Sequence, residues 1–317
     1  MPSSTLVYHE HVSLKDKNWF GVGGNARWYT EPTTSQEFEQ ALTFAHTKNL
    51  PLFILGEGAN ILISDDGFNG LVIHPKLQTI THTSNDNEYA LVTAGAGVAF
   101  RSLITYCLDS NLISLEEFSG IPGTVGGSVY INIHYFNFLL SQFLIKAEVI
   151  EKSTGEILPV DTNWFEFGYD QSKLFDQNYY LVTATFQVKK ATSTETAYAR
   201  GRHDEMIRYR QYRYPNAGTC GSFFRNFHAV EIEKARCDKK LIYVAYYLDK
   251  LGVKGELHVN DAYVSHQHAN MIVNKGAATA TDIVMLTRKM QELVYNEFGI
   301  IPQPECQLIG FKEYPLL

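Results

Sequence analysis

The sequence predicts an α+β fold, in which helices and strands alternate irregularly along the chain. Two observations lead to this prediction. Capped amphipathic helices are expected near both ends, over 34–49 and 279–298. Short apolar or alternating segments typical of strands lie between them. The chain has 317 residues, of which 45% are apolar, so more than one domain is expected.

The first helix is predicted from Thr34 and Glu37, which form a T-x-x-E capping box ahead of apolar residues at helical spacing. It should end near Asn49, before a proline. Short apolar segments that suit strands follow it: LPLFILG (50–56), ILIS (61–64) and LVIH (71–74). The sequence DDGFNG (65–70) between the last two is typical of a turn.

Further elements are expected towards the C-terminus. Residues 144–160 and 178–190 alternate as strands do, and residues 194–212, rich in charge and tyrosine, suit a helix before a domain boundary. A second amphipathic helix is indicated by Phe100, Leu103, Ile104, Cys107 and Leu108. Thr279 and Asp282 should cap the final helix. Its buried face is predicted to carry Ile283, Leu286, Met290, Leu293, Val294 and Phe298.

Composition excludes several classes of protein. A net charge of -7 disfavours a general nucleic-acid surface, although a local basic pocket remains compatible with it. We expect no membrane span and no secretory signal, because no apolar run is long enough and the first residues lack the required pattern. The cysteines are far apart and form no CxxC pair, which favours reduced thiols in the cytosol and no metal site: Cys107, Cys220, Cys237 and Cys306.

Three glycine-containing stretches stand out: FGVGGNA (20–26), GEGAN (56–60) and GIPGTVGGS (120–128). Each one alone is more typical of an ordinary turn. Together they favour a phosphate-bearing cofactor held by several loops, because glycine lets backbone N–H groups approach an oxyanion. A Rossmann site is a poor fit, since Ile61 occupies the place of its third glycine and a strand is expected to follow.

These stretches belong to a longer series of motifs. In order they are NWFGVGGNARW, LPLFILGEGANILISDDGFNGLVI, AGAGVAF, SGIPGTVGG, FEFGY, CGSFFRN, HANMIVN and FGIIPQPE. The series resembles UDP-N-acetylenolpyruvoylglucosamine reductases (UDP-N-acetylmuramate dehydrogenases) from about Asn18 to Gly310. The short chain between Ser172 and Ser222 is similar to the branch of that family without an extra tyrosine-bearing loop.

The resemblance implies a fold and a division of the chain. The family has two FAD-binding subdomains of the vanillyl-alcohol oxidase type and a C-terminal α+β substrate domain. The expected boundaries are 1–78 for the first subdomain, with 310–317 returning to it, 79–212 for the second, and 213–309 for the substrate domain.

The resemblance also implies an activity. The family reduces the enolpyruvyl ether of UDP-N-acetylglucosamine to UDP-N-acetylmuramic acid for peptidoglycan synthesis, with FAD as cofactor and NADPH as reductant. The expected partner is a UDP-linked amino sugar, with no nucleic acid and no membrane. We expect a cytoplasmic monomer or weak homo-oligomer.

Site residues carry over where the motifs match. The implied FAD contacts are Gly56, Gly58, Ala59, Asn60, Ile61, Gly120, Gly123, Thr124 and Gly126. The implied substrate contacts are Tyr169, Arg213, Arg225, Asn226 and His268. Ser222 matches the family's proton donor and Glu305 its catalytic glutamate, for which an electrostatic and orienting role is expected. Outside this context, Ser222 is typical of a turn and Glu305 of a solvated surface.

Two groups of residues have open interpretations. Arg208, Arg210 and Arg213 alternate with tyrosines, and they suit either a pocket for the uridine diphosphate or an exposed helix face. His268 and Asn270, in HANMIVN, are as residue types more typical of satisfied structural groups than of ligands.

The active-site motifs also depart from the family. The family commonly has an arginine where this chain has Asp170, in GYDQS, and a carboxylate beside an anionic intermediate should raise the barrier. Lys173 is close enough in sequence to supply the missing charge. Bulk replaces glycine at His134, in NIHYFN. Three interpretations follow: a divergent working reductase, a flavoenzyme of the same fold acting on another nucleotide sugar or small acid, and a non-catalytic FAD-binding homologue.

Overall fold

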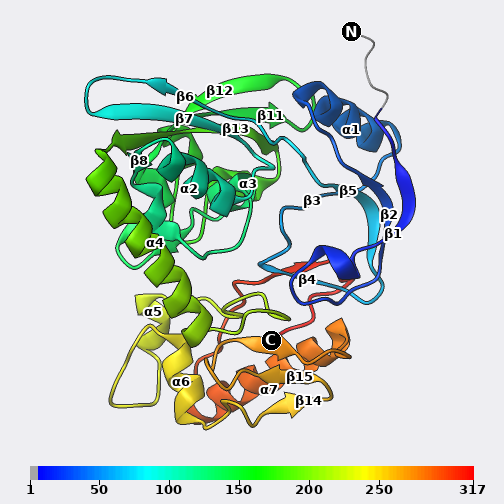
Figure 1. Cartoon of the computed structure of the whole chain (residues 1–317). Coiled ribbons are helices and arrows are strands. Elements are labelled where there is room, and N and C mark those ends of the chain that lie inside the picture. The colour runs from blue at the N-terminus through cyan, green and yellow to red at the C-terminus, as the bar shows by residue number, and fades with distance from the viewer. Residues whose placement is uncertain (1–5) are drawn as a thin grey trace. The chain divides into compact units, whose positions relative to one another are not determined.

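The computed structural model describes residues 6–317, which form two compact units (Figure 1). Unit 1 contains the residues up to 10, together with 28–57 and 70–210; unit 2 contains 11–27, 58–69 and 211–317. The chain crosses from one unit to the other between Glu57 and Gly58, inside the GEGAN stretch. This stretch therefore contributes residues to both units.

The elements of unit 1 are α1 (Ser35–Thr47), β3 (Leu52–Ile54), β6 (Ile80–Ser84), β7 (Tyr89–Gly95), α2 (Phe100–Asp109), β8 (Leu112–Ile113), η2 (Leu115–Phe118), α3 (Val125–Tyr130), β9 (His134–Tyr135), β10 (Phe138–Leu139), η3 (Leu140–Gln142), β11 (Leu144–Glu151), β12 (Ile157–Asp161), η4 (Asn163–Phe165), η5 (Lys173–Asp176) and β13 (Tyr179–Lys190). The elements of unit 2 are η1 (Lys15–Lys17), β4 (Ile61–Ile63), α5 (Ala229–Ile232), α6 (Val244–Lys250), β14 (His258–Val259), β15 (Ala262–Val264), β16 (Ile272–Asn274), α7 (Ala280–Phe298) and β17 (Gln307–Ile309). Four elements cross the division: β1 (His9–Ser13), β2 (Asn25–Thr30), β5 (Phe68–Ile73) and α4 (Ser193–Arg213).

The main sheet of unit 1 is antiparallel and has the order β12–β11–β13–β7–β6, with β8 paired to β13 (Figure 1). Ala184 of the central strand lies opposite Ala147 on one side and Ala94 on the other. These small side chains leave room for α3, which contacts β13 and β7. A methyl group on Gly126 of α3 would come 3.1 Å from the carbonyl oxygen of Ala96. The third glycine stretch is thus packed closely against the sheet.

Unit 2 is built around α7, which packs against α6 and against the small antiparallel sheet β14–β15–β16. Its core also includes Phe20, Val22 and Leu62 from the N-terminal part of the chain. Strand β4 pairs in parallel with β17, so Ile61 lies opposite Gln307. These contacts explain why 11–27, 58–69 and 310–317, which we expected with the first FAD-binding subdomain, lie in unit 2. The subdomain boundary at residue 78 stays a prediction.

Most of the expected elements are confirmed. Thr34 accepts a hydrogen bond from the Glu37 N–H at 3.1 Å and begins α1, although the Glu37 carboxylate bonds Thr33 instead of returning to Thr34. The five residues predicted for the buried face of the second helix are all buried in α2. Residues 193–213 form α4 and 179–190 form β13. No helix within 6–317 has the length and apolarity that a bilayer crossing requires.

Three details of the expected elements are wrong. Residues 144–160 form the two strands β11 and β12, because the chain turns at Gly155 in a left-handed conformation (φ 73°). The turn after β4 ends at Gly67, and β5 already begins at Phe68. Leu293 of α7 is 37% exposed, since the buried stripe of that helix runs through Ile283, Met290 and Val294.

Candidate active site

In unit 1, the GEGAN and GIPGTVGGS stretches are tied together. The Glu57 carboxylate accepts a hydrogen bond from the Gly123 N–H at 2.9 Å, and its other oxygen pairs with Arg101 at 2.7 Å. A methyl group on Gly56 would come 2.9 Å from the Thr124 hydroxyl oxygen. The missing side chain at Gly56 therefore lets the two loops meet. Glu57 was not among the expected site residues, although it lies inside the expected motif.

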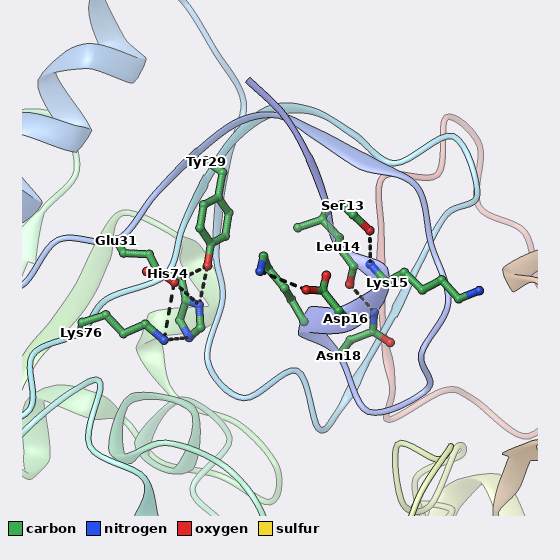
Figure 2. Close-up of polar contacts among 10 residues, drawn as sticks. Ser13, Leu14, Lys15, Asp16, Asn18, Tyr29, Glu31, His74 and Lys76 are labelled. Atoms are coloured by element: carbon green, nitrogen blue, oxygen red, sulfur yellow. Dashed lines mark hydrogen bonds and ion pairs between the residues drawn. The ribbon is translucent and has the colours of Figure 1, made fainter. Parts of the chain in front are cut away.

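In unit 2, the rest of GEGAN lies against the turn 14–18 shown in Figure 2. Asn18 donates from Nδ2 to the Leu14 carbonyl oxygen at 2.7 Å and so holds this turn closed. Gly58 is left-handed (φ 68°), its carbonyl oxygen accepts from the Trp19 N–H, and a methyl group on it would come 2.4 Å from the Lys17 carbonyl oxygen. Glycine is required at this position on both counts.

Asn60 has a side-chain oxygen without a hydrogen-bond partner among the described residues. Oδ1 is buried and accepts no hydrogen bond from any described residue. Leaving a buried polar atom unpaired costs about 1–3 kcal/mol, so such atoms usually mark a site for a ligand or a water. The unpaired amide oxygen and the glycines around it fit an FAD-binding stretch. The neighbouring Ile61 is buried in β4, while Ala59 is half-buried.

Ser222 and Glu305 are brought together in unit 2 by backbone pairing. Ser222 forms an isolated bridge with Met271, and the Glu305 N–H donates to the Phe223 carbonyl oxygen at 2.9 Å. Two residues further on, the Gln307 N–H donates to the Asn60 carbonyl oxygen at 3.1 Å. Segments distant in sequence thus place the predicted acid, the predicted glutamate and the glycine stretch side by side.

Arg225 and Asn226 follow Ser222 directly. Both terminal nitrogens of Arg225 donate to the Glu231 carboxylate, each at 2.8 Å, and Nη1 also bonds the Asn226 carbonyl oxygen. The Arg225 guanidinium lowers the pKa of Glu231 to about 2. Arg225 is therefore held in one orientation by an ion pair, and its role as an anion ligand stays a prediction.

His268 is half-buried beside Tyr214, whose ring centroid is 5.7 Å away. Partial burial, helped by the nearby charges of Arg213 and Lys254, lowers the pKa of His268 to about 4. The imidazole is therefore neutral near pH 7. In that form it can accept a hydrogen bond on one nitrogen and donate one from the other.

Of the arginines interleaved with tyrosines, Arg208 is exposed and pairs with Glu205 on the same helix. Arg210 donates to the Gly120 carbonyl oxygen at 2.9 Å, and its side chain fills the space beside that glycine. Arg213 lies over the Tyr214 ring. Arg208 thus belongs to the helix surface and Arg210 supports a glycine stretch, whereas a role of Arg213 in binding the uridine diphosphate stays a prediction.

Residues 212–309 match the family model of the UDP-N-acetylenolpyruvoylglucosamine reductase C-terminal domain, and residues 26–161 match a model named FAD binding domain. The UDP-N-acetylenolpyruvoylglucosamine reductase of Synechococcus sp. (strain JA-3-3Ab) is 32% identical over 96% of this chain and 92% of its own. This chain belongs to the UDP-N-acetylenolpyruvoylglucosamine reductase family.

Other members of this reductase family are similar to this chain over nearly its whole length. The reductase of Chlamydia muridarum is 32% identical over 96% of this chain and 95% of its own. The crystal structure of the reductase from Thermus caldophilus superposes with a TM-score of 0.77 at 27% identity, covering 96% of this chain and all of that one. The resemblance read from the motifs is thereby confirmed, as is the combination of an FAD-binding domain with the family's C-terminal domain.

Asp170 stands where the motif led us to expect an arginine. It is left-handed (φ 52°), and its Oδ1 lies 3.1 Å from Nδ1 of His134, whose ring packs on the exposed Tyr169. Within residues 6–317, Lys173 forms no ion pair with Asp170. Instead it pairs with Glu166 at 3.1 Å and lies over the Trp164 ring. The side chain beside Asp170 is thus that of His134, a neighbour that sequence reasoning missed.

Proposed function

We propose that this chain reduces UDP-N-acetylglucosamine enolpyruvate to UDP-N-acetylmuramate for peptidoglycan synthesis, with bound FAD and with NADPH as the reductant. The observation that supports it most is the pairing of the Ser222 and Glu305 segments beside Asn60. Membership of the family supports the same substrate and cofactor. The nucleotide-linked substrate and the free cysteines favour a cytoplasmic location.

The chain's own residues have distinct parts in this proposal. Reduction of the double bond adds a hydride to one carbon and a proton to the other, and FAD, when bound, would supply the hydride from N5. We assign the proton to the half-buried Ser222 hydroxyl, which regains one from solvent afterwards. A serine is a weak acid, so its donation needs neighbouring groups that stabilise the developing charge and fix its direction. Glu305 is assigned to orient this hydroxyl and the substrate.

The cofactor would be held by the glycine stretches. Gly56 and Gly58 let this stretch pack closely on Thr124 and on the turn 14–18, and Asn60 offers its unpaired Oδ1 to a donor. Glu57 fixes the second loop through Gly123. These residues fit a dinucleotide without any metal ligand. Within the described 6–317, no cluster of histidine, cysteine or carboxylate side chains suits a metal ion.

The test separates the two half-reactions. Ser222→Ala should leave flavin reduction by NADPH intact, and it should lower turnover of the enolpyruvyl substrate by at least roughly 10²–10⁴-fold, the usual contribution of a positioned acid. Ser222→Cys, which keeps a weak acid, should recover part of the loss. Ser265→Ala removes a buried hydroxyl that accepts from Gln267 in the same unit and serves as the matched control. Unchanged olefin turnover in Ser222→Ala would overturn the acid assignment.

A second candidate is a flavoenzyme of the same fold acting on another nucleotide sugar or small acid, and Asp170 favours it. The two are separated by stopped-flow reoxidation of the NADPH-reduced protein with the enolpyruvyl substrate. Rapid reoxidation supports the proposal, and a yellow protein that does not respond to this substrate supports the second candidate. A colourless protein that takes up no FAD would indicate a non-catalytic homologue.

A further inference from the structure

Asn270 is buried (3% exposed) directly beside the segment that carries Ser222. Its side chain makes two hydrogen bonds to one residue. Oδ1 accepts from the Phe224 N–H at 3.1 Å, and Nδ2 donates to the Phe224 carbonyl oxygen at 2.7 Å. Its own carbonyl oxygen accepts from the Phe223 N–H at 2.8 Å. One asparagine therefore binds the two residues that follow the proposed acid.

The pattern on the other side of this segment explains why a side chain is needed there. The Phe223 carbonyl oxygen accepts from the Glu305 N–H, and the Arg225 N–H donates to the Gln303 carbonyl oxygen. Phe224 lies opposite Pro304 in a pair that exchanges no hydrogen bonds, so the N–H and C=O of Phe224 point away from the 303–306 segment and towards Asn270. The amide of Asn270 supplies the donor and the acceptor that a neighbouring strand would otherwise give to Phe224.

The backbone of Asn270 is itself held by a hydrogen bond. The Asn270 N–H donates to Nδ1 of His268 at 3.3 Å, which requires that nitrogen to be unprotonated. Partial burial keeps the His268 pKa low, at about 4, so the ring is neutral near pH 7 and has one nitrogen that can accept this bond. Phe223 and Phe224 are both buried in the core of unit 2, so the packing of their side chains also fixes this segment.

We propose that Asn270 is a positioning residue for proton transfer: its amide fixes the 222–224 backbone against the 303–306 segment and thereby sets Ser222 relative to Glu305. The inference rests on the function proposed above, because it assigns Asn270 to the proton step of that reaction. Asn270 acts through Ser222 and has no contact with the reacting atoms in this assignment. A displacement of about 1 Å at a reacting group can cost roughly 10²-fold in rate.

Asn270→Ala removes both side-chain bonds, and Asn270→Asp keeps the acceptor but loses the donor to Phe224. We expect turnover of the enolpyruvyl substrate to fall about 10²-fold in Asn270→Ala and less in Asn270→Asp. The solvent deuterium isotope effect on that step should rise, since proton transfer becomes more limiting. The rate of flavin reduction by NADPH, the FAD absorbance spectrum and the dissociation constant of the substrate should stay within about twofold, because these do not depend on the acid.

Asn274→Ala is the matched control. Asn274 also uses its side-chain amide to fix backbone in unit 2, bonding the Phe20 carbonyl oxygen and the Gly276 and Ala278 N–H groups. Its loss should lower the melting temperature without raising the isotope effect. If Asn270→Ala does not fold, Asn270→Asp carries the test.

A double-mutant cycle decides the mechanism. In a Ser222→Ala background, Asn270→Ala should have no further effect on olefin reduction, because the group it positions is gone. Full additivity of the two losses would overturn the positioning role while leaving the acid assignment intact. An unchanged isotope effect together with a merely lower melting temperature would also overturn it. Failure of Ser222→Ala to affect turnover would instead overturn the function proposed above.

Discussion

At the scale of single residues, Asp170 combines an unusual backbone conformation with a half-buried carboxylate. Its backbone is left-handed, its side chain is 13% exposed, and its Oδ2 is buried with no partner among the described residues. A left-handed residue other than glycine costs of order 1–3 kcal/mol where the strain is not relieved locally. His134 is the side chain that contacts this carboxylate, at 3.1 Å. We therefore expect the effects of the two residues on stability to be coupled.

Removing one member of this pair should therefore be worse than removing both. We expect His134→Gln to lower the free energy of unfolding by about 1–3 kcal/mol, because a half-buried carboxylate is left without its partner. Adding Asp170→Asn should restore most of that loss. Urea unfolding of the two single variants and the double variant at pH 7 measures the coupling, and strictly additive losses would contradict it.

At the scale of elements, the short helix α5 is tied to the active-site segment by one carboxylate. Glu231 accepts from the His228 N–H at 2.6 Å, as a capping residue, and at the same time binds both terminal nitrogens of Arg225. A four-residue helix has little stability of its own. Its position therefore depends on this carboxylate and on the Arg225 ion pair.

The Arg225 pair predicts a dependence on pH. The pKa of Glu231 falls from 4.5 in the unfolded chain to about 2 in the folded one, so the stabilisation is fully present above about pH 4.5 and is lost as the pH falls towards 2. Wild type should thus lose more unfolding free energy than Glu231→Gln between pH 6 and pH 3. Denaturant titrations at both pH values provide the comparison, and parallel losses would show that the ion pair does not contribute.

The start of α7 shows how far an element's partners can lie in sequence. Thr279 and Asp282 form the expected capping box. In addition, the Asp65 carboxylate accepts from the Ala280 N–H at 2.8 Å and the Thr281 N–H at 2.9 Å. The box could be predicted from four consecutive residues. The second cap could not be predicted in this way, because Asp65 is far from α7 in the sequence and contacts it only in the folded unit 2.

At the scale of the whole molecule, each unit has its own core, and each core contains a buried cysteine. Cys107 lies in the core of unit 1 and Cys306 in that of unit 2. Burial raises the pKa of Cys107 to about 12, and burial together with Cys220 also raises the pKa of Cys306. Cys237, by contrast, is half-buried. Thiol reactivity can therefore report on each core separately.

Alkylation of the native protein at pH 8 should modify Cys237 first, while Cys107 and Cys306 react only when their own unit opens. All four cysteines should react at similar rates in denaturant. Peptide mass spectrometry over a time course measures the order. Fast modification of Cys107 or Cys306 in the native protein would contradict the two-core description.

The sequence alone determined the type of most elements and the membership of the family. Helix caps, apolar spacing and glycine stretches are local signals, since the residues that produce them lie within a few positions of one another. Ser222 and Glu305 could be named because their motifs are local as well. Leu293 was misassigned, because helical spacing gives the apolar face but leaves open which edge of it the neighbouring elements cover.

Tertiary structure decided which segments meet. The Glu57–Gly123 bond, the His134–Asp170 pair, the Asn270 clamp on Phe224 and the pairing of β4 with β17 all join residues far apart in the chain. A buried asparagine or glutamate looks the same in sequence whether it serves the core or the site. Its partner is fixed only when the chain folds, because hydrogen bonds act over about 3 Å and carry no signature along the sequence.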